Sequence, residues 1–120
     1  MRRKPGTLVP LELAICSTAA DLHHSGTREF YGYDLARRLR DLTDRRLLTA
    51  YGTLYRALGR LETMGLVRSR WEDPEIPARE SRPSRRLYTL TPAGEAAVHE
   101  ARNAMRERAS RRLRHRRAPA

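Results

Sequence analysis

Two stretches near the start of the chain have apolar residues at the spacing of an α-helix. The first predicts a helix over residues 8–22, with Pro10 tolerated in its first turn. Its apolar positions are Leu11, Ile15, Ala19 and Leu22. Because this segment has almost no polar face, we expect it to be buried on most sides, in the core or against a second subunit. The second stretch predicts a helix over residues 33–42, with leucines on one face and charged residues on the other.

A third amphipathic stretch follows a short polar connection at residues 43–48. It predicts a helix over residues 50–64, with Thr49 as the N-cap and Gly65 as the residue that ends it. The inner face of this helix is formed by Leu54, Leu58 and Leu61. The residues expected to face outward are Thr53, Arg56, Ala57 and Arg60.

Strand character appears in residues 66–71, where arginines separate Leu66 and Val67 from Trp71, and in residues 86–90, where Leu87, Tyr88 and Leu90 can pack. Residues 73–84 between them contain three prolines and several charges, so we expect a hairpin with a long loop at its tip. Thr91 followed by Pro92 is a helix start signal. It predicts a last helix over residues 92–113, followed by a basic, frayed tail. This helix has a thin apolar seam at every fourth residue, formed by Ala97, Ala101, Met105, Ala109 and Leu113.

The predicted order is helix, helix, helix, strand, strand, helix, which is mainly α with a small β-hairpin. Two helices joined by a short connection and followed directly by a hairpin are typical of a winged helix-turn-helix, here with an added C-terminal dimerisation helix. We therefore divide the chain into a basic N-terminal arm (1–7), a winged helix-turn-helix DNA-binding domain (8–90), a dimerisation helix (91–113) and a basic tail (114–120).

In this geometry the third helix enters the major groove of DNA, and the hairpin, or wing, touches the neighbouring backbone or minor groove. The expected contacts from the recognition helix are Thr49, Tyr51, Gly52, Thr53, Arg56 and Arg60. The expected contacts from the wing are Arg79, Arg82, Arg85 and Arg86. Gly52 costs roughly 1 kcal/mol of helix propensity relative to alanine, which fits either a close approach of the backbone to DNA or a frayed helix start.

The formal net charge of +11 indicates a polyanionic partner. The last 20 residues alone carry +7, and we leave open whether they follow flanking DNA or form a solvated helix face. Cys16 lies in an apolar run and is expected to be a buried small hydrophobe. No stretch is apolar enough to cross a membrane, so we expect a cytoplasmic protein, associated with the nucleoid through DNA and not with a membrane.

Three other functions fit parts of this pattern. An RNA- or ribosome-associated basic winged-helix protein would also fit the charge, but the tyrosines are not arranged as a strand platform for stacking bases. An enzyme is not expected, since none of the four histidines (His23, His24, His99 and His115) forms a catalytic motif with a serine, cysteine or carboxylate. A metal sensor using the adjacent histidines and Cys16 lacks metal-ligand spacing, so we expect neither a metal nor a cofactor.

Three motifs resemble the PadR family of transcriptional regulators. The run from Tyr51 to Val67 is similar to the family's Gly-Thr/Ser-Leu-Tyr-x-x-Leu-x-x-Leu-x-x-x-Gly-Leu-Ile/Val stretch. Gly32-Tyr33-x-Leu35 resembles its His-Gly-Tyr-x-Leu/Ile opening of the second helix, with Tyr31 in place of histidine. The segment from Arg86 to Gly94 resembles its Arg/Lys-x-Tyr-x-Leu-Thr-x-x-Gly second wing strand and helix start. The resemblance covers residues 8–100.

The resemblance implies a homodimer that represses promoters and binds double-stranded DNA at a palindromic operator. In the family the dimer forms through the first and last helices, which here gives Leu11, Ile15, Ala97, Ala101 and Met105 as candidate dimer contacts. The loop at residues 23–29 is longer than in the family pattern. Some relatives bind flat aromatic ligands between subunits, but the last helix here has no aromatic residue, so an effector molecule stays an open question.

Overall fold

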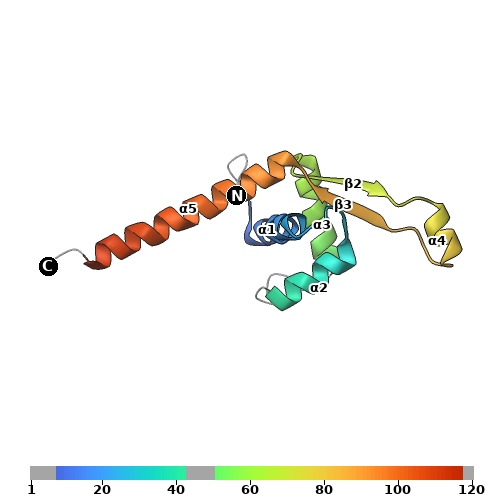
Figure 1. Ribbon diagram of the computed structural model, residues 1–120, viewed down its shortest axis with the longest axis horizontal. Helices are drawn as coiled ribbons and strands as arrows, with labels where there is room; N and C mark the ends of the chain where they lie inside the picture. Colours follow the sequence, from blue (N-terminus) through green and yellow to red (C-terminus); the bar gives the residue numbers. More distant parts are fainter. Residues whose placement is uncertain (1–7, 43–50, 118–120) are drawn as a thin grey trace.

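The computed structural model describes residues 8–42 and 51–117, which form five helices and three strands (Figure 1). In chain order these are α1 (Pro10–His24), β1 (Phe30–Tyr31), α2 (Gly32–Leu42), α3 (Tyr51–Thr63), β2 (Val67–Trp71), α4 (Glu75–Arg79), β3 (Arg86–Leu90) and α5 (Pro92–Arg117). The predicted N-terminal arm, the connection at 43–48 and the Thr49 N-cap lie outside the described residues.

The sheet has three antiparallel strands in the order β1-β3-β2, not the two that the sequence predicts. β2 and β3 form the predicted hairpin, with Val67 opposite Leu90 and Trp71 opposite Arg86. The missed strand, β1, pairs Phe30 with Tyr88 on the other side of β3. Two residues are too few to show an alternating pattern, and their pairing partner is far along the chain, so the sequence pattern does not reveal this strand.

The predicted loop at 73–84 contains the short helix α4, so this part of the prediction was incomplete. Prolines do not prevent it, because Pro74 precedes the helix and Pro77 lies in its first turn, where a backbone N–H has no intrahelical partner. Asp73 also helps to start the helix, since its Oδ1 accepts the backbone N–H of Glu75 at 3.1 Å.

The hydrophobic core lies where α1, α2, α3 and β3 meet. Side chains with no exposed surface include Ile15, Leu35, Leu39, Leu54, Leu58 and Leu61. α1 contacts α2, α3, α5 and β3, which confirms that it is buried on most sides, within this chain. Cys16 is buried, and this burial together with the nearby Glu12 raises the pKa of its thiol to about 12. The thiol is therefore protonated at neutral pH and behaves as a small hydrophobe, as predicted.

A polar joint connects the end of α3 with the start of α5. Gly65 ends the α3 segment with a φ of 76°, as expected for a glycine after a helix. Its carbonyl oxygen accepts a hydrogen bond of 2.7 Å from the Thr91 hydroxyl, and the same hydroxyl oxygen accepts the backbone N–H of Gly94 at 3.1 Å. Thr91 is therefore the N-cap of α5, which confirms the predicted start signal.

The molecule is elongated, 70 × 29 × 27 Å, because α5 and the β2–β3 wing extend in opposite directions from the helical body (Figure 1). α5 continues to Arg117, so residues 114–117, predicted to be frayed, are helical. Arginine is a good helix former, and cations at a helix C-terminus interact favourably with its dipole. Within residues 8–42 and 51–117, no helix has the length and apolar character needed to span a bilayer.

Candidate nucleic-acid interface

The recognition helix α3 has one buried and one exposed face. Leu54, Leu58 and Leu61 are fully buried, as predicted. Ala57 is also fully buried, so its predicted outward position was wrong. Residues three and four apart share a helix face, which places Ala57 beside Leu54 and Leu61. The exposed face carries Gly52, Tyr55, Arg56, Gly59 and Arg60, while Thr53 is half-buried. Tyr51 is the first residue of α3.

Arg56 is exposed, and in the described part of the chain no hydrogen bond or ion pair engages it. Gly52 lies one turn before it. A Cβ added to Gly52 would meet only Arg56 Nη1, at 3.8 Å, so nothing within the described protein requires a glycine there. The first two turns of α3 therefore present an open backbone and a free guanidinium on the same surface.

Arg60, predicted as a DNA contact, forms an ion pair within the chain. Its Nε donates a 2.8 Å hydrogen bond to Oε2 of Glu12, a carboxylate of α1 that has no exposed surface. The other oxygen of this carboxylate accepts the backbone N–H of Val9 at 3.1 Å. A buried charge is costly unless it is paired, so Arg60 stabilises the fold by joining α3 to α1. The signal for Glu12 in the sequence was an acid between two leucines at the start of a largely apolar helix.

The wing is organised around Glu72, a residue that the sequence pattern did not single out. Arg82 donates two hydrogen bonds to this buried carboxylate, of 2.5 and 3.0 Å, and the backbone N–H of Arg85 donates a third of 2.8 Å. These donors, first of all Arg82, lower the pKa of Glu72 to about 2, so the carboxylate stays ionised at neutral pH. Arg82 is only 15% exposed and also pairs with Glu80. We therefore interpret Arg82 as a wing-building residue and not as a DNA contact.

Arg86 connects the wing to the recognition helix. Its Nε donates a 2.8 Å hydrogen bond to the Ser69 hydroxyl, which in turn donates to Glu62 of α3 at 2.6 Å. The guanidinium of Arg86 also lies 5.3 Å from the ring centre of Trp71. This network sets the position of the wing relative to α3. Of the predicted wing contacts, Arg79 and Arg85 are the two that are exposed.

A hollow of about 420 Å³ between the start of α2, α3 and the wing is lined mainly by aromatic residues. Its walls include Tyr31, Tyr33, Tyr55, Trp71 and Tyr88, together with Arg85 and Arg86. Tyr33, Tyr55 and Trp71 are 56%, 46% and 59% exposed, which is high for such large rings. We call it the aromatic hollow. The sequence pattern did not reveal it, because its residues come from five separate elements.

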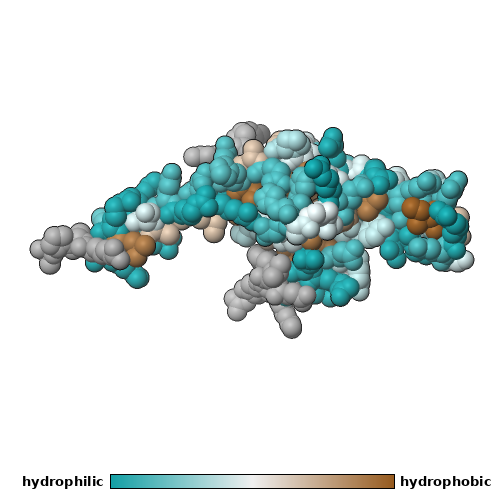
Figure 2. Space-filling view, viewed as in Figure 1, coloured by the Kyte–Doolittle hydropathy of each residue, from teal (hydrophilic) through white to brown (hydrophobic). Residues whose placement is uncertain are grey.

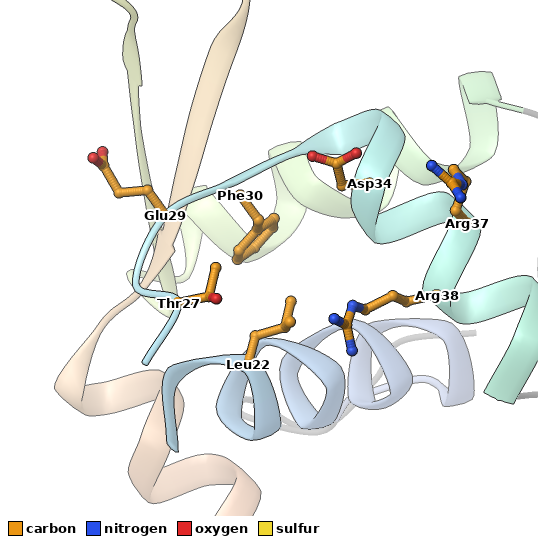
Figure 3. Close-up of a pocket in the computed structure, with 7 residues that line it drawn as sticks. All are labelled: Leu22, Thr27, Glu29, Phe30, Asp34, Arg37 and Arg38. Atoms are coloured by element: carbon orange, nitrogen blue, oxygen red, sulfur yellow. The ribbon is translucent and has the colours of Figure 1, made fainter. Parts of the chain in front are cut away.

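A second hollow, of about 480 Å³, lies between the end of α1, the loop before β1 and α2 (Figure 3). Leu22 and Phe30 form its apolar part, and Arg38 extends toward α1 across it. Its other lining residues are Thr27, Glu29, Asp34 and Arg37. Because the charges are of both signs, this hollow does not favour a polyanion, and the candidate interface is the surface of α3 and the wing.

The predicted dimer contacts separate into two groups. Leu11 and Ile15 are buried in the core of this chain, at 8% and 0% exposure, so they offer almost no surface to a second subunit. Ala97 and Ala101 are half-buried and Met105 is 54% exposed. These three line a hollow of about 350 Å³ together with Leu8, Leu13, Glu100 and Arg108. The surface that remains for a partner is therefore on α5 and the outer side of α1.

The adjacent histidines hold α1 to α5. Nδ1 of His23 lies 2.9 Å from one oxygen of Glu95, and Nε2 of His24 lies 3.4 Å from the other. The described residues contain no group of three or more histidines, cysteines or acids that could hold a metal ion. The histidines therefore have a structural role at the base of α5.

The sequence is similar to that of known regulators. The model of the transcriptional regulator PadR-like family matches residues 22–100. The transcriptional regulator Rv3488 of Mycobacterium tuberculosis is 39% identical over 86 residues, which is 72% of each chain.

Solved structures share the fold. A PadR family transcription regulator from Clostridium difficile R20291 superposes with a TM-score of 0.66 at 22% identity, covering 83% of this chain and 91% of the other. Bacillus subtilis PadR, solved in complex with operator DNA, gives a TM-score of 0.57 at 18% identity, covering 78% of this chain and 47% of the other. The family match spans well over half of the sequence and includes the wing and α3. The chain belongs to the PadR-like family of transcriptional regulators.

Proposed function

We propose that this protein binds duplex DNA in a sequence-specific way and regulates transcription as a homodimer, as a repressor acting at a palindromic operator. Its family is one of transcriptional regulators, not enzymes. A protein with this function acts in the cytoplasm, on the nucleoid. The similar fold of Bacillus subtilis PadR, a protein solved with operator DNA, supports the DNA part of the proposal.

The observation that carries the proposal is the exposed face of the first two turns of α3. Gly52 and Arg56 are exposed side by side, whereas the other face of the helix is locked into the core. An arginine can make two hydrogen bonds to the O6 and N7 edge of guanine in the major groove. The open backbone at Gly52 allows the helix end, whose first N–H groups have no partner within the helix, to approach a phosphate. Arg79 and Arg85 of the wing then supply phosphate or minor-groove contacts.

Arg56→Ala is expected to weaken operator binding by about 1–3 kcal/mol and to relax base preference at one position in each half-site. The operator can be obtained by sequencing the DNA that the purified protein retains from a genomic pool. Titration with that duplex, and with variants at each base pair, measures both effects. Equal weakening on every sequence would show that Arg56 contacts only phosphate, and unchanged binding would contradict the proposal.

The aromatic hollow favours a second candidate, an RNA-binding or ribosome-associated function. Exposed rings next to guanidinium groups are suited to stacking unpaired bases, which duplex DNA does not offer. Trp71 is the only tryptophan and lies in this hollow, so its fluorescence reports binding there. Stronger binding to structured RNA than to the selected duplex, with quenching of Trp71, would favour this alternative over DNA.

We expect a dimer in solution, formed through the exposed seam of α5 and the outer side of α1. Met105→Asp is expected to halve the mass measured by light scattering at micromolar concentration, since it places a charge in an apolar contact. Ala96→Asp is the matched control, because Ala96 is exposed on the opposite side of the same helix. A wild-type monomer would refute the dimer, and dissociation by both variants would place the contact elsewhere.

A further inference from the structure

α5 has two halves that differ in their contacts with the rest of the chain. In the first half, Glu95 contacts the adjacent histidines, and Arg102 donates to Oδ1 of Asp21 at 3.1 Å. Beyond Met105, no residue in the described part of the chain has a hydrogen bond or ion pair with another element. Figure 1 shows this second half, orange to red, projecting away from the body.

The projecting half contains most of the unbalanced charge of the protein. Residues 105–117 include seven arginines and one glutamate, which supply +6 of the formal net charge of +11. In the described body, Arg60, Arg70, Arg82 and Arg86 each form an ion pair with a glutamate. In the described part of α5, by contrast, no hydrogen bond or ion pair engages Arg108, Arg112 or Arg116.

The seven arginines of the projecting half, taken together, surround the helix. At about 100° per residue, Arg112 and Arg116 point within roughly 20° of the direction of Met105, so they interrupt the apolar seam beyond that residue. Met105 and Leu113 stay more than half exposed, and Figure 2 shows only a small apolar patch near this end of the molecule. A second copy packed along this half would have to desolvate several guanidinium groups, and the same half of its own α5 offers only Glu107 to pair them. The predicted dimerisation helix at 91–113 is therefore divided near Met105.

The spacing of the free arginines matches a polyanionic backbone. Arg108, Arg112 and Arg116 follow each other at four residues, or about 6 Å along the helix axis. Like charges at this spacing destabilise an isolated helix, and a partner with regularly spaced negative charges would remove that repulsion. An anionic membrane surface fits less well, because a helix that lies in a membrane interface needs a continuous apolar face.

We propose that residues 106–117, the basic arm of α5, bind the phosphate backbone of duplex DNA outside the segment that α3 contacts, without regard to base sequence. This inference rests on the proposed DNA-binding function. This contact extends the length of duplex that the protein covers and adds salt-dependent affinity. The base preference comes from α3.

The test compares two triple variants of the full chain. Arg108→Gln/Arg112→Gln/Arg116→Gln removes three charges, and Arg108→Lys/Arg112→Lys/Arg116→Lys keeps them on the same helix. Binding is measured over a series of salt concentrations to the duplex selected by the wild-type protein, once trimmed to the protected site and once with long flanks.

We expect the glutamine variant to bind the long duplex about tenfold or more weakly, with its salt slope reduced by about 0.9 for each lost phosphate contact. The trimmed duplex should be affected less, and the lysine variant should resemble the wild type. An unchanged salt slope would overturn the inference. So would a glutamine variant that turns a wild-type dimer into a monomer, or arginine-dependent binding to phosphatidylglycerol vesicles without an effect on DNA. If the wild type itself prefers no duplex, the proposed function has failed and not the basic arm alone.

Discussion

Gly94→Ala is expected to destabilise the fold by about 3 kcal/mol, at the upper end of the usual cost of overpacking a core. Gly94 lies in the first turn of α5, where an added Cβ would come within 2.2 Å of the Leu66 backbone oxygen and 2.4 Å of Leu90 Cδ1. Leu66 cannot retreat freely, because its carbonyl accepts the backbone N–H of Thr91 at 3.0 Å. Relief of the clash would therefore separate α5 from the end of α3. Urea unfolding followed by circular dichroism, at fixed protein concentration, measures the loss.

Gly59→Ala is the matched control for this prediction. Gly59 is an exposed residue inside α3, and nothing lies within 4 Å of the Cβ that alanine would add. The same chemical change should therefore stabilise the protein there, by about 0.5–1 kcal/mol, through helix propensity alone. If both variants unfolded at the same urea concentration as the wild type, the close packing of α5 against Leu66 would be wrong.

Arg60→Ala is expected to lower the free energy of unfolding by about 2 kcal/mol, because it removes a charged hydrogen bond from a buried carboxylate. Glu12 has no exposed surface and depends on Arg60 Nε at 2.8 Å. The arginine itself is 46% exposed, so water can partly replace it, and we expect less than the loss of a fully buried pair. Urea unfolding of Arg60→Ala, Glu12→Gln and the double variant gives the coupling energy between the two residues.

Arg56→Ala is the control on the same helix. Arg56 is exposed one turn earlier and has no hydrogen bond or ion pair within the described chain, so its removal should change stability by less than about 0.5 kcal/mol. The two arginines should thus separate cleanly, Arg60 affecting stability and Arg56 affecting DNA binding. An Arg60→Ala variant that keeps full stability and loses operator affinity would restore the interpretation of Arg60 as a DNA contact.

The sequence alone determined the four long helices, the hairpin and the family motifs. Helices of eleven residues or more show their period clearly, and capping residues such as Thr91 and Gly65 act over only a few positions of the chain. Burial of Cys16 and of the α3 leucines follows from the same local pattern. These features could be predicted because each depends on neighbours within one or two helical turns.

Only the tertiary structure decided which arginines are free to contact a partner. Arg60 and Arg82 look like Arg56 and Arg79 in the sequence, but they are bound to acids, Arg60 to one on a distant element and Arg82 to one across the wing loop. β1, the aromatic hollow and the separation of α5 into two halves also depend on residues that meet only after folding. The physical reason is that ion pairing and burial are set by distance in space, which the order of residues along the chain does not specify.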